Sequence, residues 1–225
     1  FLIVFVVYVL VAELLGYEIE RVVGDAAEIQ ALRRQFPLAT DGDTDWPDIQ
    51  LALCTGIVDD HTRKQHLGHG YTLHTTLMRP KSRGSVTLQS ADPYQAPAID
   101  PGFFTHPDDM AVAIKGARMG FEILEAKAMA PYRGKRLHPF DVNDDKAMEA
   151  FLRATCDTEY HPVGTCRMGP DTDPMAVVDA QLRVRGVQAL RVVDASIMPA
   201  LTTGNTNAPT MVIGEKAADL IRSGA

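Results

Sequence analysis

The feature of this sequence that most constrains its fold is a close succession of strand-type segments. Residues 48–58 are largely apolar, residues 71–78 are rich in Thr, Leu and Tyr, and residues 85–89 alternate between apolar and polar side chains. The last two segments are separated only by the basic turn RPKSRG at 79–84. This spacing predicts an antiparallel hairpin between residues 71–78 and 85–89.

Two helices are predicted after these segments. Residues 105–130 carry apolar side chains at helical spacing, and Pro107 suits the first turn of a helix. Either Thr105 or His106 can cap the N-terminus of this helix. A second helix is expected to begin near Asn143.

The pattern changes after Cys156. Short apolar runs at 177–179, 182–184 and 190–193 predict strands separated by turns, and a last helix is expected at about 209–224. The chain is therefore predicted to be a mixed α/β (α+β) protein. An antiparallel sheet with helices comes first, and a strand-turn-helix segment follows.

The first 44 residues differ in composition from the rest. An apolar run occupies residues 1–12, residues 13–35 have a helix-forming composition, and residues 38–47 are predicted to form a loop at a domain boundary. The apolar run is shorter than the roughly 20 residues of a membrane-spanning helix, so a buried strand or helix is expected. A residue of truncation or a foreign junction is the alternative, because the chain begins at Phe1 rather than Met.

Charge and cysteine content exclude several classes of function. The formal net charge of −7 opposes binding to a phosphate backbone, so no nucleic-acid partner is expected. The three cysteines contain no C-x-x-C motif, which is unlike a disulfide framework or a zinc knuckle. We expect a cytoplasmic protein without stable membrane insertion, with peripheral membrane association as the alternative.

The segment YHPVGTCRMG at 160–169 contains the first candidate catalytic residue. His161 precedes a proline, which favours an extended backbone, and the glycines allow tight turns or close approach to a ligand. A histidine side chain can accept a proton near neutral pH. A purely structural role for His161 is an equal alternative on this pattern alone.

The segment at 190–219 contains a second group of candidates. A predicted strand ends at Asp194, and Asn205, Thr206 and Asn207 form a polar cluster before the last helix. The N-terminus of a helix presents unpaired N–H groups, which favour a carbonyl oxygen or a delocalised anion. Alternatively, Thr206 or Asn207 simply caps the helix.

Taken together, these segments resemble the C-terminal signatures of glucose-methanol-choline (GMC) flavin oxidoreductases. The resemblance rests on HPVGTCRMG at 161–169, on DASIMP and GNTNAPT within 194–210, and on the intervening segment 177–196. Upstream, DIQL, RPKSRG, SADP and PAIDP are similar to the pattern of the family's substrate domain. The resemblance covers about residues 45–224 and favours the branch of choline and alcohol dehydrogenases.

The resemblance implies a reaction and a set of site residues. The reaction is oxidation of a primary alcohol, choline-like or aliphatic, to an aldehyde, with hydride transfer to FAD. His161 is implied as the base toward the substrate hydroxyl, and Asn205 as its partner. The implied cofactor contacts are Asp194 and Ala195 near the phosphate and ribitol, and Thr206 and Asn207 near the flavin ring. The expected partners are the alcohol and an electron acceptor, either oxygen or a quinone-type molecule.

The resemblance also implies a domain organisation. Residues 45–158 are expected to form the substrate-binding domain, and residues 159–225 the active-site loops and last segment of the FAD-binding domain. The G-x-G-x-x-G fingerprint of the family's Rossmann-like half does not occur in this sequence, so that half is expected to be missing from the chain. A catalytically incompetent C-terminal remnant, or a binding module, is therefore the alternative to an enzyme.

Other site types are less well supported. His61, His66 and His69 lie near Asp59 and Asp60, but they lack the i, i+4 histidine spacing of a metalloprotease helix. A solvated loop or the rim of a substrate pocket is preferred, and no metal is expected. A serine hydrolase is disfavoured because the sequence has no G-x-S-x-G. The basic residues of the turn at 79–84 are expected to lie at the surface.

Overall fold

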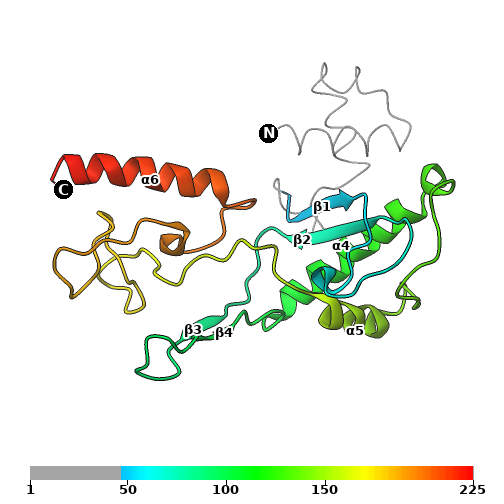
Figure 1. The fold of residues 1–225 in the computed structure, drawn as a ribbon, viewed down its shortest axis with the longest axis horizontal. Helices are drawn as coiled ribbons and strands as arrows, with labels where there is room; N and C mark the ends of the chain where they lie inside the picture. Colours follow the sequence, from blue (N-terminus) through cyan, green and yellow to red (C-terminus); the bar gives the residue numbers. More distant parts are fainter. Residues whose placement is uncertain (1–46, 225) are drawn as a thin grey trace, which may run out of the picture. The chain divides into compact units, whose positions relative to one another are not determined.

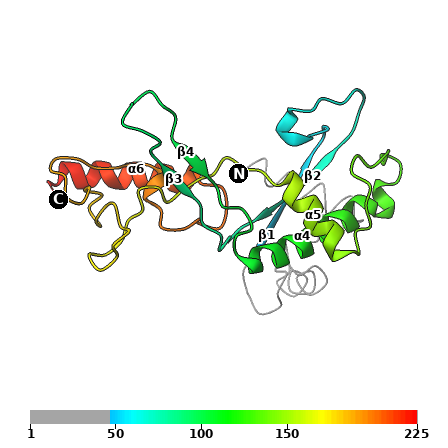
Figure 2. The same cartoon turned by 90° about the horizontal axis from the view of Figure 1, so that it is seen from below.

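The computed structural model describes residues 47–224, which form two compact units (Figures 1 and 2). The first unit contains the described residues up to Leu77 together with His106–Asp157. The second unit contains Met78–Thr105 and the residues from Thr158 onward. The apolar run at 1–12, the helix predicted at 13–35 and nearly all of the loop predicted at 38–47 lie outside the described residues.

The first unit is built on a two-stranded antiparallel sheet. Strand β1 (Ile49–Cys54) pairs with strand β2 (Thr72–Leu77), with Ile49 opposite Leu77 at one end and Cys54 opposite Thr72 at the other. Both strands fall within segments that the sequence predicts as strands, so these two predictions are confirmed.

Helix α4 (Pro107–Glu125) packs against this sheet. The close approach depends on Gly116, where an added Cβ would lie 2.8 Å from Cδ1 of Ile49 and 3.0 Å from Cγ2 of Thr75. A glycine in a helix interior lowers helix stability, so its presence here has a packing reason. The small residue allows the helix backbone to lie directly on the strands.

The N-terminus of α4 shows which of the two candidate caps is used. Nδ1 of His106 accepts a hydrogen bond from the backbone N–H of Asp108 at 3.2 Å, and Pro107 occupies the first turn. The hydroxyl of Thr105 instead donates to the carbonyl oxygen of Gly102 at 2.9 Å. His106 is therefore the cap.

Helix α5 (Asp145–Thr155) begins close to the predicted position and is capped by Asp144. Phe140 joins it to α4, because its ring lies 5.6 Å from Phe121 edge-on and 4.8 Å from Phe151 in a stacked geometry. Met148 of α5 is completely buried. Aromatic pairing and burial of this methionine thus hold the two helices together.

The prediction of a hairpin between residues 71–78 and 85–89 is wrong. Strand β3 (Ser85–Thr87) pairs with strand β4 (Ala98–Asp100), and β2 pairs with β1 instead. The β3–β4 pairing is tight at Gly84, where a Cβ would lie 2.1 Å from the carbonyl oxygen of Asp100. Sequence alternation predicted a strand at residues 85–89, of which Ser85–Thr87 form β3. It could not identify the partner strand, because β4 is too short to give a periodic signal.

Beyond residue 157 the second unit contains little regular structure before its final helix. The strands predicted at 177–179, 182–184 and 190–193 appear only as isolated bridges. Val178 bridges to both Met168 and Val184, and Arg183 bridges to Arg191. The short helix η3 (Ala195–Ile197) and helix α6 (Asn207–Arg222) follow. The buried core of this unit consists of Val178, Leu182, Ile197 and Ala217, with Met168, Val177, Val184, Val192, Ile213 and Leu220 packed around it.

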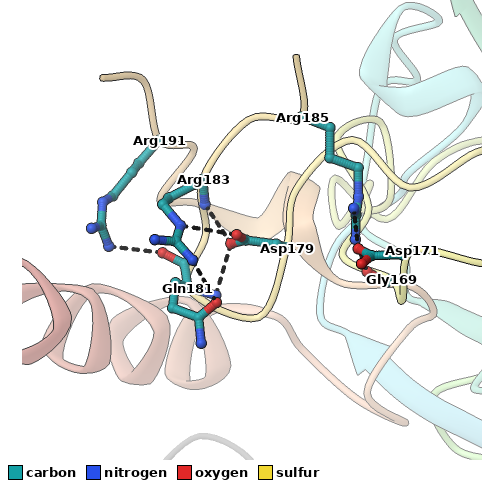
Figure 3. A network of polar contacts seen from close by, with 7 residues as sticks. All are labelled: Gly169, Asp171, Asp179, Gln181, Arg183, Arg185 and Arg191. Atoms are coloured by element: carbon teal, nitrogen blue, oxygen red, sulfur yellow. Dashed lines mark hydrogen bonds and ion pairs between the residues drawn. The ribbon is translucent and has the colours of Figure 1, made fainter. Parts of the chain in front are cut away.

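Hydrogen bonds to one carboxylate replace a sheet in part of this unit (Figure 3). Asp179 accepts bonds at 2.9 Å from the backbone N–H groups of Gln181 and Arg183 and from Nε of Arg183. Arg191 then donates to the carbonyl oxygen of Gln181 at 2.8 Å. Burial opposes ionisation of Asp179, but the bonds from Arg183 and Gln181 outweigh this and lower the pKa of the carboxyl group.

Helix α6 begins at Asn207, two residues before the predicted start, and ends at Arg222. Ala217 of this helix is buried in the core, and Ile213 and Leu220 pack against that core. Within residues 47–224, no helix combines the length and the apolar character needed to cross a bilayer.

Candidate functional site

The loop that carries His161 is bonded to the segment that carries Asp194 and Ala195. The backbone N–H of Cys166 donates to the carbonyl oxygen of Ser196 at 3.0 Å, and that of Met168 donates to Ile197 at 2.7 Å. His161 itself is half-buried. Two segments that the sequence singled out separately are thus held side by side in one unit.

The same loop is anchored on its other side by arginines. The guanidinium of Arg167 binds both carboxylate oxygens of Asp173, at 2.7 and 2.8 Å. Figure 3 shows Arg185, which donates to the carbonyl oxygen of Gly169 at 2.7 Å and pairs with Asp171 at 2.5 Å. These contacts fix the end of the His161 loop without a regular strand.

Asp194 has a defined local role as the cap of η3. One carboxylate oxygen accepts bonds from the backbone N–H of Ser196 at 2.8 Å and from its hydroxyl at 2.5 Å. The side chain is exposed, whereas Ala195 is half-buried. The capping bonds fix an exposed carboxylate at the start of η3.

Asn205 follows a turn with unusual backbone geometry. Thr203 has φ +58° and Gly204 has φ +147°, and both values lie in the region that L-residues other than glycine rarely adopt. Asn205 is exposed and stands directly before the buried Thr206. The turn therefore presents the Asn205 side chain at the start of α6.

The start of α6 also tests the two candidate side-chain caps, Thr206 and Asn207. Thr206 occupies the N-cap position of α6, but its side chain makes no capping hydrogen bond. Its carbonyl oxygen accepts bonds from the backbone N–H and the hydroxyl of Thr210, at 3.0 and 2.7 Å. Neither Thr206 nor Asn207 caps the helix with its side chain.

A contact of Arg79 was not predicted from the sequence. This residue is exposed, as expected, but its Nε donates to the hydroxyl of Thr203 at 3.2 Å, across 124 residues of sequence. Thr203 belongs to the turn that precedes Asn205. Arg79 belongs to the basic motif at 79–84, but the motif alone does not show which distant segment the Arg79 side chain contacts.

Two histidines of the histidine-rich stretch lie close to carboxylates. Nε2 of His66 lies 2.8 Å from one oxygen of the buried Asp59, and Nε2 of His138 lies 3.3 Å from the other. His61 lies 3.6 Å from Asp157. Within residues 47–224, no three His, Cys, Asp or Glu side chains form a group that could hold a metal ion.

These pairs hold a strained turn. Asp60, His61 and Thr62 have φ values of +49°, +50° and +66°. Each such residue costs on the order of 1–2 kcal/mol in the left-handed region. Arg63 stabilises the turn by pairing with Asp60 at 2.8 Å and with Asp157 at 2.6 Å.

We expect Asp59→Asn to lower stability at neutral pH and to remove part of the acid sensitivity. The hydrogen bond from His66 lowers the pKa of Asp59 below 3.8, despite burial. A carboxylate with a lowered folded-state pKa contributes stability above its unfolded value and loses it as the pH falls through the folded value. At pH 6 we expect a loss of about 1–2 kcal/mol in the free energy of unfolding.

Urea unfolding at pH 6 and in steps below pH 4 measures both effects. Asp219→Asn is the matched control, because Asp219 is exposed and pairs with Arg222 at 3.3 Å. A constant stability difference between wild type and Asp59→Asn across the acid range would contradict the assignment.

Comparison with known proteins places these segments in a family. The family model described as GMC oxidoreductase matches residues 80–214. The chain is 46% identical over 178 residues to an alcohol dehydrogenase [acceptor] of Pseudomonas putida, covering 79% of this chain and 32% of the relative. It is 47% identical over 177 residues to the mitochondrial choline dehydrogenase of Mus musculus, covering 78% of this chain and 30% of the relative.

Solved structures agree with this match. A formate oxidase from Aspergillus oryzae RIB40 aligns with 89% of this chain and 36% of its own length, with a TM-score of 0.73 and 27% identity. The chain spans about a third of the length of the curated relatives that it matches. It belongs to the GMC oxidoreductase family.

Proposed function

We propose that this chain is the C-terminal third of an FAD-dependent enzyme that oxidises a primary alcohol, choline-like or aliphatic, to an aldehyde. One observation carries the proposal. The His161 loop is bonded to η3, which follows Asp194, and the same unit contains the Asn205 turn and the start of α6. All six proposed site residues therefore belong to one unit.

The residues present fit an FAD cofactor. The exposed carboxylate of Asp194, fixed by Ser196, is suited to accept hydrogen bonds from ribityl hydroxyls. The first turn of α6 lacks a side-chain cap, so its N–H groups suit the carbonyl oxygens or delocalised charge of a flavin ring near Thr206 and Asn207. Ala195 is small enough to permit close contact. When bound, the flavin supplies the acceptor for hydride.

His161 and Asn205 have complementary roles in the proposed reaction. Oxidation requires removal of the hydroxyl proton and stabilisation of the oxygen that becomes negatively charged. An imidazole can take that proton near neutral pH. An asparagine amide cannot act as a base, but it can donate a hydrogen bond to the developing alkoxide. We therefore assign the proton to His161 and the hydrogen bond to Asn205.

Several relatives support the substrate and cofactor classes. The matched proteins of Pseudomonas putida and Mus musculus are named for alcohol and choline oxidation. The formate oxidase of Aspergillus oryzae was solved in a study of FAD modification. A relative from Pseudomonas savastanoi is named oxygen-dependent choline dehydrogenase, 45% identical over 179 residues, so oxygen is one acceptor to test beside a quinone-type molecule.

We also propose that residues 45–158 serve substrate binding and residues 159–225 serve the cofactor and the active-site loops. The longer of the two stretches of the second compact unit begins at Thr158, next to the proposed boundary. It also includes Met78–Thr105, so the segment that contains β3 and β4 is packed with the proposed active-site loops. The hydrogen bond from Arg79 to Thr203 connects the segment after β2 to the turn before Asn205.

The test is visible absorption of the purified full-length protein that carries this chain, without oxygen. Bound oxidised flavin that loses its colour on addition of choline or a simple primary alcohol is the expected result. Bound flavin that stays oxidised with every alcohol would refute the substrate class. Absence of flavin from the full-length protein would favour a non-catalytic remnant or binding module. Readmission of oxygen or of a quinone analogue then identifies the acceptor.

A further inference from the structure

The turn before Asn205 is supported by the chain that leaves strand β2. Met78 and Arg79 are the first two residues after β2, and both approach this turn. Nε of Arg79 donates to the hydroxyl of Thr203, and Cε of Met78 lies 3.8 Å from the point where a Cβ of Gly204 would stand. An apolar and a charged side chain therefore meet two successive residues of the turn.

Those two residues need such support. Thr203 is β-branched, and a β-branched residue at φ +58° is a conformational outlier. Such a geometry persists only where surrounding contacts hold it. The next residue, Gly204, has φ +147°, a value that is natural only for glycine. The direction of the Asn205 side chain follows from these two backbone conformations.

We propose that Arg79 is a positioning residue that holds the Thr203–Gly204 turn and so sets the place of the Asn205 amide. The inference rests on the proposed function only for its catalytic consequence. Arg79 acts through Thr203 and needs no contact with substrate. A guanidinium suits this task because its planar N–H groups donate in fixed directions, whereas a lysine ammonium does not.

The chain offers a closely matched control. Arg83 lies in the same exposed basic turn, and its Nη1 donates to the carbonyl oxygens of Pro80 and Ser82, at 2.7 and 2.9 Å. These partners belong to the basic turn itself. R83M therefore removes the same charge from the same neighbourhood without touching the Asn205 turn.

The kinetic experiment compares five variants in the full-length protein. R79M and T203V should each slow flavin reduction at saturating alcohol by about 10-fold, with KM changed less than about 2-fold, because misplacement of a catalytic group affects the reaction step. The double variant should be no slower than the slower single variant. R79K should recover part of the rate, and R83M should match wild type. Effects of R79M and T203V that multiply would overturn the proposal.

A second readout does not depend on activity. Amide hydrogen exchange, measured without substrate, should become faster at residues 203–207 in R79M and T203V but not in R83M. Unchanged exchange in both variants would overturn the proposal, whatever the enzyme's reaction is. Failure of the wild-type flavin to be reduced by any alcohol would instead count against the proposed function. The two failures are therefore distinguishable.

Discussion

Replacement of His161 by alanine in the full-length protein is expected to slow flavin reduction by roughly 10²–10⁴-fold, the usual contribution of a positioned base. The half-buried histidine lies in a loop that two backbone bonds join to η3, so its removal should leave the surrounding structure in place. Rapid mixing of oxidised enzyme with alcohol, without oxygen, measures the rate.

His106→Asn is the matched control for this prediction. His106 is the only histidine within residues 47–224 that is an α-helix cap, and asparagine can also accept the capping bond. Its rate should equal that of wild type. A His161→Ala variant that reduces its flavin at the wild-type rate would show that another group takes the proton.

Asn205→Ala is expected to slow flavin reduction by roughly 10²-fold while FAD stays bound. The estimate comes from the loss of one hydrogen-bond donor to a developing oxyanion. Because an amide does not titrate, the pH dependence of the remaining rate should be that of wild type.

Flavin content after gel filtration must be measured together with the rate. Asn143→Ala, at an exposed position before helix α5, is the control for loss of an asparagine side chain. Purification of Asn205→Ala without flavin would move this residue from alkoxide stabilisation to cofactor binding. Full flavin content with a wild-type rate would remove it from both roles.

Local sequence patterns predicted the elements that depend on nearby residues. The strands β1 and β2 and the helices α4, α5 and α6 were found because their apolar spacing and capping residues are local signals. The pairing of β3 with β4 was missed because it depends on a close approach at Gly84 and on a partner of three residues. The predicted strands after residue 176 became isolated bridges, because hydrogen bonds to Asp179 take the place of a ladder.

In the candidate site too, features with a local sequence signal were predicted and features that depend on distant residues were not. His161, Asn205 and the proposed cofactor positions came from family-specific signatures that are contiguous in sequence. The bond between Arg79 and Thr203 joins residues 124 positions apart, and neither residue is distinctive by itself. Such long-range contacts are determined by the folded structure, and no periodic pattern in the sequence indicates them.

The division into two units has a consequence for synthesis on the ribosome. Translation completes the first unit at Asp157, whereas β3 and β4 emerge before Thr158, where the remainder of their own unit begins. During that interval the hairpin formed by β3 and β4 lacks the remainder of its unit. Folding of the second unit must therefore await synthesis of helix α6, because Ala217 of this helix belongs to the buried core of the unit.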